Sequence, residues 1–355
     1  MQQDLEENFE AVLENFPIDI YSTEKMKIGG IKHDARIFKV EPEKTPLIQE
    51  NAYVGKPYII DTPPGTKIAC HPHIVGEALE RSCLDAAREF VKVLETMNML
   101  EYGRLAVLQI LRAAPGYKVT EVLPEAVPII WTRTEYRMGG YRSHFEEVRK
   151  TDITYRDYSA VDLDGYEIST LLIPDTFATG VSAENVLNDL LETGLRPRKI
   201  ILYGFISIPA LTRLGELASE NRIELVSFAI GNIMQLAHNN YDMPLYGIDE
   251  SLHSATGELK PMGSIVDEET LRTYLPLYVA GLDQPGDWSE RQSALYTGQG
   301  YERGDILGHL AKSVKLIESL RKINSKQPWY NNFHETASSR ELEKLKNSLE
   351  LYRKN

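Results

Sequence analysis

The middle of the chain alternates between short, almost continuously apolar runs and stretches in which apolar residues recur with helical spacing. The apolar runs predict five strands, at residues 105–111, 126–131, 170–173, 199–206 and 223–230. Strands that are apolar at nearly every position are typical of a parallel sheet that helices cover on both faces. Two stretches with helical spacing, at residues 183–193 and 210–219, connect the last three strands. This order predicts an α/β fold with a doubly wound, mainly parallel sheet.

The N-terminal part of the chain has a different pattern. Residues 1–16 predict an amphipathic helix, which would dock on its own domain or on a second subunit. The segment that follows is interrupted by proline and glycine, and it predicts only short strands, at residues 35–40 and 58–60. Thr-Pro-Pro-Gly at residues 62–65 predicts a turn, and the residues from 72 to 100 predict a long helix.

The C-terminal part begins with a segment, residues 231–275, that has no sustained period. A long irregular segment inside a compact domain is often a lid or another functional loop. Residues 306–323 and 340–351 predict two closing helices. We therefore expect an N-terminal arm with an irregular β-like segment (1–71), a main α/β domain (72–304) with an inserted hood or lid (231–277), and C-terminal helices (305–355).

Charge and composition narrow the classes of partner. The chain has 355 residues, of which 52 are acidic and 39 are basic, and its formal net charge is −13. A negative surface repels phosphate backbones, so we expect no nucleic-acid partner. One tract is locally basic and aromatic, and we interpret it first as a loop that covers a diphosphate and second as a nucleic-acid patch: Arg133, Tyr136, Arg137, Tyr141, Arg142 and Arg149.

The cellular compartment is predicted from cysteine content and hydropathy. Cys70 and Cys83 are too few for a disulfide framework, and the acidic first 16 residues do not resemble a signal peptide. The longest apolar stretch, residues 200–211, is too short to span a bilayer. We therefore expect a cytoplasmic protein with no membrane partner.

Residues 171–182, Leu-Leu-Ile-Pro-Asp-Thr-Phe-Ala-Thr-Gly-Val-Ser, carry the strongest chemical signal. A buried strand ends at an acidic residue, a loop rich in small and hydroxyl residues follows, and a helix then begins. Free N–H groups and the positive end of a helix dipole suit a phosphate monoester. Asp175 would accept hydrogen bonds from the hydroxyls of an attached sugar. The alternative is an ordinary strand-turn-helix with Ser182 as the N-cap.

This loop resembles the phosphoribosyl-diphosphate motif of type I phosphoribosyltransferases. The resemblance implies that Ala178, Thr179, Gly180, Val181 and Ser182 hold a 5′-phosphate. Residues 109–116, Gln-Ile-Leu-Arg-Ala-Ala-Pro-Gly, resemble the pyrophosphate loop of the uracil-specific branch, in which Arg112 would fork onto diphosphate oxygens. Arg133 corresponds to a second diphosphate-binding arginine of that family.

Residues 278–287, Tyr-Val-Ala-Gly-Leu-Asp-Gln-Pro-Gly-Asp, are similar to the base-recognition loop of the same branch. The similarity implies that the base is selected by Tyr278, Asp283, Gln284 and Pro285. Two positions depart from the family pattern. Most type I enzymes carry two acidic residues before the phosphate loop, whereas this chain has Pro174 and Asp175, so ribose recognition is expected to be rearranged. Gln284 stands where the family has an aspartate, which leaves the identity of the base open.

Taken together, the resemblance implies transfer of phosphoribose from phosphoribosyl diphosphate to a uracil-like nucleobase, with release of diphosphate. Arg112, Arg133 and Asp175 would be the catalytic residues, Mg²⁺ would be bound mainly through the substrate diphosphate, and the enzyme would be a homodimer or a larger homo-oligomer. The alternatives are a non-catalytic sensor of a nucleotide or of phosphoribosyl diphosphate, and a nucleotide-binding enzyme of other chemistry on the same scaffold.

Two further groups of polar residues were considered as ligands. Cys70-His71-Pro72-His73 places three potential metal ligands within four residues, but no partner with zinc-like spacing occurs elsewhere in the sequence. We favour a turn there and predict no metal-binding residues. Residues 238–241, His-Asn-Asn-Tyr, could face a ligand or form a polar loop, and we favour the loop.

Overall fold

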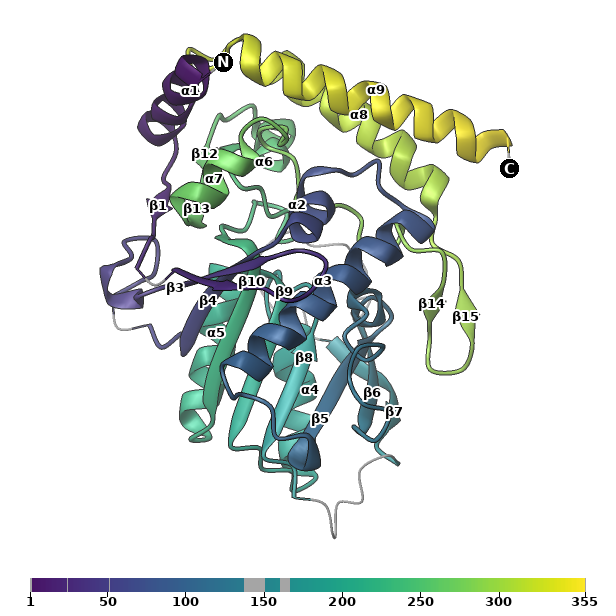
Figure 1. Ribbon diagram of the computed structural model, residues 1–355. Coiled ribbons are helices and arrows are strands. Elements are labelled where there is room, and N and C mark those ends of the chain that lie inside the picture. The colour runs from purple at the N-terminus through teal and green to yellow at the C-terminus, as the bar shows by residue number, and fades with distance from the viewer. Residues whose placement is uncertain (1, 24, 51, 137–150, 160–166, 355) are drawn as a thin grey trace.

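A computed structural model describes residues 2–23, 25–50, 52–136, 151–159 and 167–354, and one sheet runs through its centre (Figure 1). The strands along its main path are, in spatial order, β2 (Lys25–Ile28), β3 (Ala35–Lys39), β4 (Lys56–Asp61), β10 (Glu224–Met234), β9 (Lys199–Ser207), β8 (Thr170–Pro174), β5 (Leu105–Leu111), β6 (Ile129–Tyr136) and β7 (Thr151–Asp157). The strands from β4 to β6 are parallel to one another, and β2, β3 and β7 add antiparallel edges. The prediction of a mainly parallel sheet is therefore confirmed.

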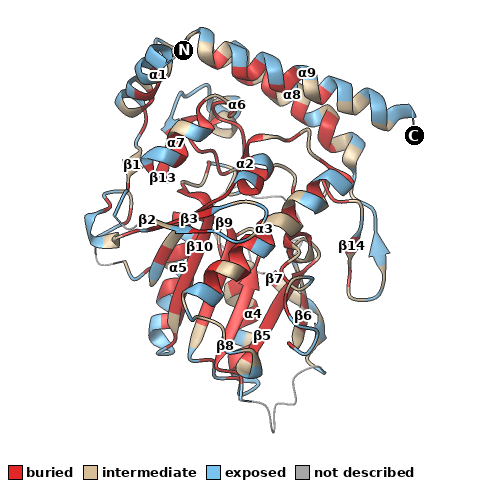
Figure 2. Cartoon of the chain, in the orientation of Figure 1, coloured by how far each residue is buried: buried red, intermediate tan, exposed pale blue. Residues whose placement is uncertain are grey.

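Helices cover both faces of this sheet, as the apolar strands require. Helices α2 (Pro63–Cys70) and α3 (Gly76–Thr96) pack on one face, and α4 (Val181–Glu192) and α5 (Ile208–Glu220) pack on the other (Figure 1). Alternate residues of each strand belong to the two resulting cores. On β5, for example, Val107 contributes to the core under α3, whereas Ala106 and Leu108 contribute to the core under α4. Figure 2 shows the central strands as almost wholly buried.

The connection from β4 to α3 differs from its prediction. Residues 62–65 do not form an isolated turn, because Thr62 is the N-cap of α2 and its Oγ1 accepts a hydrogen bond from the Gly65 N–H (2.9 Å). Prolines fit the first turn of a helix, where N–H groups have no helical partner. The long helix then begins at Gly76 rather than at residue 72. Hence the Pro-Pro pair starts a helix here and does not interrupt one.

The N-terminal helix α1 (Gln2–Asn15) docks on its own chain. Phe9, Val12 and Phe16 are buried and belong to the same large hydrophobic core as residues of α3 and the C-terminal helices. The Arg272 guanidinium, on α7 (Glu268–Tyr274), lies 3.7 Å from the centre of the Phe9 ring and pairs with Glu6 (2.8 Å). The helix was predicted to dock either on its own domain or on a second subunit, and in the structure it docks on its own domain.

Residues 231–277 contain short elements that hydrophobic periodicity does not reveal. After β10 ends at Met234 the chain forms β11 (Gly247–Ile248), α6 (Glu250–Thr256), β12 (Pro261–Met262), β13 (Ser264–Val266) and α7. Strand β13 pairs antiparallel with the end of β10 and parallel with β1 (Asp19–Ile20). Much of the segment is buried, since its elements continue the core beyond the carboxyl end of the sheet.

The last two helices, α8 (Ile306–Asn324) and α9 (Asn332–Lys354), lie together above the carboxyl end of the sheet (Figure 1). Asn324 fixes the end of α8, because its amide donates to the Ala280 carbonyl (2.9 Å). The helices of the described ranges include none that combines the length and apolar character needed to cross a bilayer.

Gly204 on β9 allows the chain after β8 to approach the sheet closely. Its φ is +144°, and a Cβ there would lie 2.0 Å from the carbonyl oxygen of Asp175. We expect Gly204→Ala to lower the free energy of unfolding by about 3 kcal/mol, because the backbone at Asp175 would have to move. Urea denaturation measures this, with Gly103→Ala as the control, since a Cβ at Gly103 meets nothing within 4 Å. Equal losses in the two variants would contradict the expectation.

Candidate functional site

A cavity of about 170 Å³ lies where β8 ends and α4 begins. Its wall combines the predicted phosphate loop, the end of the predicted pyrophosphate loop, the predicted base loop and the segment after β10. The lining residues are Ala113, all residues from 175 to 183, Asn240, Tyr241, Asp283, Pro285, Gly286, Trp288 and Ser289. Ligands of open α/β sheets bind at this edge, where the carboxyl ends of the strands meet.

The phosphate loop is held from behind by α5 and the residue that precedes it. Ser207, the N-cap of α5, donates to the Ala178 carbonyl, and the Arg213 Nε donates to the Thr179 carbonyl (2.9 Å). In a trans peptide the N–H points opposite to the C=O. The N–H groups of Thr179 and Gly180 are therefore directed away from these two partners, which makes them available as donors to an anion.

The start of α4 adds further donors. Gly180 is the N-cap, with φ +75°, and Ser182 lies inside the first turn, so the interpretation of Ser182 as the N-cap is wrong. The N–H groups of a first helical turn have no partner within the helix. Glu184 would repel an anion there, but its carboxylate pairs with Arg213 (2.8 Å). These features make the loop a suitable site for a phosphate group.

Asp175 lies at the end of β8 and contributes to the cavity wall. Its own N–H donates to the Tyr203 carbonyl on β9 (3.0 Å), which fixes the backbone. Burial raises the pKa of the Asp175 carboxyl to about 7, although the Thr176 N–H donates to Oδ1 (2.8 Å) and acts in the opposite direction. A carboxyl group with this pKa can exchange a proton near neutral pH.

Two aromatic residues that the sequence analysis did not select join the three loops. Tyr117, directly after the predicted pyrophosphate loop, shares a hydrogen bond with Thr176 of the predicted phosphate loop (2.6 Å). Its ring stacks on Trp288, directly after the predicted base loop, with 4.6 Å between ring centres. The Trp288 indole in turn donates to the Ala113 carbonyl (3.2 Å). These contacts hold the loops in one arrangement around the cavity.

Asp283 is the residue of the predicted base loop that places a carboxyl group in the cavity wall. Its Oδ1 accepts a hydrogen bond from the Met243 N–H (2.8 Å). Burial, with repulsion from Asp242, raises the pKa of the Asp283 carboxyl well above its usual value. Asn240 and Tyr241 complete this side of the wall, so the part of the 238–241 loop that we expected to be only a polar connection faces the cavity.

The arginines predicted to bind diphosphate are not among the residues that line the cavity. Arg112 follows β5, across a cis peptide bond from Leu111, and pairs with Glu302 (2.5 Å) on β15 (Tyr301–Glu302). Arg133 is the register partner of Leu111 on β6 and pairs with Glu135 (3.1 Å). The remaining arginines of the basic tract, Arg137, Arg142 and Arg149, lie outside the described residues, as does Tyr141.

Two predicted base-binding residues are also not in the cavity wall. Tyr278 is fully buried, and its hydroxyl donates to the Leu282 carbonyl and accepts from the Leu245 N–H (3.0 Å), so it braces the loop from within. Gln284 is also buried, and within the described part of the chain neither atom of its amide has a hydrogen-bond partner. The part of this loop that lines the cavity therefore consists of Asp283, Pro285 and Gly286, and Trp288 follows directly after it.

Arg291 positions the base loop from behind, and sequence reasoning did not identify it. The side chain is completely buried, and burial lowers the pKa of its guanidinium to about 10. It donates to the carbonyls of Pro285 (2.9 Å), Ile68 (3.1 Å) and His71 (3.0 Å). A lone arginine in a polar stretch has no periodic signal, so its burial could not be inferred from local sequence.

The fold and cavity thus define an α/β protein with a cavity at the carboxyl edge of a mainly parallel sheet. Searches found no protein-family model and no curated protein sequence that matches the chain.

Proposed function

We propose that the protein is a phosphoribosyltransferase of the type I fold, nearest to the uracil-specific branch, and that it acts in this cavity. One observation carries the proposal: three loops that resemble the phosphate, pyrophosphate and base loops of that family meet at one cavity, although they are separated along the chain. The loop around Gly180 would hold the 5′-phosphate, and Asp175 would accept from the ribose hydroxyls. Arg112 and Arg133 would neutralise the leaving diphosphate once they exchange their carboxylate partners for it.

In the proposed reaction a ring nitrogen of the base attacks C1 of the ribose. The bond from C1 to the diphosphate oxygen breaks, the new bond from C1 to nitrogen forms, and the nitrogen loses its proton to the medium or to a basic group. Catalysis of such a displacement depends on positioning and on stabilising the leaving group. Trp288, which is buried and stacked on Tyr117, would give the cavity wall a rigid apolar part on the side where the base is expected.

Mg²⁺ fits this site as a substrate-bound ion. An oxygen ligand of the kind that it prefers is present, because the Asp175 carboxyl, which has a pKa of about 7, contributes to the wall. Among the described residues, however, no group of three potential ligands gathers at the cavity. Asp175 would therefore bind the ribose hydroxyls, and Mg²⁺ carried by the diphosphate would offset part of the diphosphate charge.

The test is a mass-spectrometric assay of the purified chain with phosphoribosyl diphosphate, Mg²⁺ and a panel of bases. We expect a nucleotide and free diphosphate with a uracil-like pyrimidine or pyridone, and little product with adenine, whose donor and acceptor order is reversed. Binding of phosphoribosyl diphosphate without product would favour a sensor. The observation that favours this second function is the ion pair between Arg112 and Glu302, because it occupies an arginine that catalysis would need. Absence of both binding and turnover would overturn the proposal.

The raised pKa of Asp175 predicts how ligand affinity depends on pH. With a pKa of about 7, the carboxyl is about one tenth ionised at pH 6 and about nine tenths ionised at pH 8. If the carboxylate accepts from ribose hydroxyls, the affinity for ribose 5-phosphate should rise up to about tenfold over this interval. Calorimetry at several pH values measures the effect. Asp175→Asn is the control, because the ligand's phosphate still titrates in this variant whereas residue 175 does not. An equally steep pH dependence of affinity in Asp175→Asn would contradict the proposed role of the Asp175 carboxylate.

A further inference from the structure

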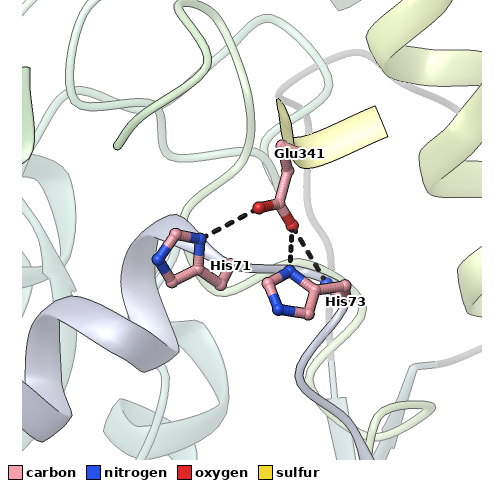
Figure 3. Close-up of side chains that lie close together, drawn as sticks. All are labelled: His71, His73 and Glu341. Atoms are coloured by element: carbon pink, nitrogen blue, oxygen red, sulfur yellow. Dashed lines mark hydrogen bonds and ion pairs between the residues drawn. The ribbon is translucent and has the colours of Figure 1, made fainter. Parts of the chain in front are cut away.

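A second cluster of polar side chains lies between the α2–α3 connection and α9, formed by His71, His73 and Glu341 (Figure 3). The His71 Nδ1 lies 2.9 Å from one carboxylate oxygen of Glu341, and the His73 Nδ1 lies 2.5 Å from the other. The His73 N–H also donates to that carboxylate (3.3 Å). Each of the three side chains offers one potential ligand atom, a ring nitrogen or a carboxylate oxygen, and these three atoms all lie within 4.8 Å of one another.

Side chains from other parts of the chain bind the backbone that carries the two histidines. The His71 carbonyl accepts from Arg291 (3.0 Å), the Pro72 carbonyl contacts the His309 Nε2 (2.9 Å), and the His73 carbonyl accepts from the Ser348 hydroxyl (3.5 Å). Three successive carbonyls are thus bound by side chains from three other parts of the chain. A metal site gains affinity when the protein fixes its ligands before the ion arrives.

We propose that His71, His73 and Glu341 bind a Zn²⁺ ion that fastens α9 to the α2–α3 connection. Two imidazole nitrogens and one carboxylate oxygen form a known kind of Zn²⁺ ligand set, with a water in the fourth position. Ligand atoms at about 2.0–2.1 Å from a tetrahedral ion are about 3.3 Å apart. The contacts of 2.5 and 2.9 Å would therefore have to lengthen, and the ligand atoms that are up to 4.8 Å apart would have to approach one another. Cys70 is adjacent in sequence but is not a member of the cluster.

The burial of the three side chains suits a structural ion that can still enter from solvent. The Glu341 side chain is only 2% exposed, whereas those of His71 and His73 are 12% and 18% exposed. An ion could therefore approach on the histidine side and reach a carboxylate that is already buried. Glu341 and Ser348 are seven residues apart, two turns of α9, so the same helix face supplies a ligand and a backbone contact.

The first test measures binding of Zn²⁺ to the full chain after treatment with a chelator. We expect one equivalent by elemental analysis, a dissociation constant below about 1 µM by competitive titration, and a rise in melting temperature on adding the metal. Co²⁺ should give the intense visible absorption of a tetrahedral site. Failure to bind one equivalent at micromolar Zn²⁺ would overturn the proposal.

Matched variants then locate the ion. Glu341→Gln and His71→Asn should each weaken Zn²⁺ binding at least tenfold, because each removes one ligand. Glu343→Gln, at an exposed position of the same helix, and His33→Asn should leave binding unchanged. Melting curves recorded without metal show whether each variant is folded. Undiminished binding in folded Glu341→Gln and His71→Asn would place the ion elsewhere and overturn the assignment, whatever the outcome of the phosphoribosyl-transfer assay.

Discussion

Replacing Gly180 by valine should reduce the affinity for ribose 5-phosphate compounds more than 100-fold while the protein remains folded. Gly180 has a φ of +75°, in the left-handed region that β-branched residues avoid, and a Cβ there would lie 3.2 Å from the Ala210 Cα. The loop would have to move away from α5, and the N–H groups of Thr179 and Gly180 would no longer point toward the phosphate. Calorimetric titration with ribose 5-phosphate measures the loss.

The matched control for this prediction is Gly194→Val. Gly194 follows α4 at its other end, also has a positive φ (+100°), and has no atom within 4 Å of an added Cβ. It therefore reproduces the backbone strain of about 1–2 kcal/mol without touching the cavity. Gly194→Val should bind as the unmodified protein does. Unchanged affinity in a folded Gly180→Val variant would show that the phosphate binds elsewhere.

Arg112→Lys should lower kcat/KM for phosphoribosyl diphosphate about 30- to 1,000-fold, which corresponds to about 2–4 kcal/mol of transition-state stabilisation. Lysine keeps the charge but cannot fork onto two diphosphate oxygens. Binding of the product nucleotide should change little, because the product has no diphosphate. Steady-state kinetics and calorimetry separate the two effects.

Two further variants test the role of Arg112. Arg104 lies at the opposite end of β5 and pairs with Glu167. The variant Arg104→Lys should therefore leave the kinetics unchanged. Glu302→Gln removes the carboxylate that holds Arg112 and should strengthen binding of phosphoribosyl diphosphate. Partly exposed ion pairs of this kind contribute about 1 kcal/mol or less, so a diphosphate can displace the glutamate. Equal losses of affinity for phosphoribosyl diphosphate and for the product nucleotide in Arg112→Lys would contradict the assignment.

The predictions from sequence were most accurate where the determining interactions are local. The strand at 105–111 agrees with β5 at both ends, because a run of apolar residues between polar ones marks its own limits. The strand-loop-helix order at residues 171–182 was predicted for the same reason, since the end of β8, the glycine and the start of α4 are contiguous; phosphate binding by this loop stays a prediction. Its place in a cavity followed from a general property of parallel sheets.

The base loop shows where local reasoning failed. Tyr278 and Asp283 are both polar residues in one loop, yet Tyr278 is turned into the core and Asp283 toward the cavity. That difference depends on which distant groups offer hydrogen bonds, here the N–H groups of Leu245 and Met243. The short strands β11 to β13 were missed because two or three residues are too few to show a period.

By itself, the sequence determined the strands and helices of the α/β unit and the position of the loop between β8 and α4, because each of these depends on neighbouring residues. Only the tertiary structure decided which residues face the cavity and that Trp288 stacks on Tyr117. It also brought Glu341 to His71, 270 residues away along the chain. Such contacts arise from the packing of whole elements against one another, and no local pattern of side chains records which distant surface a residue will meet.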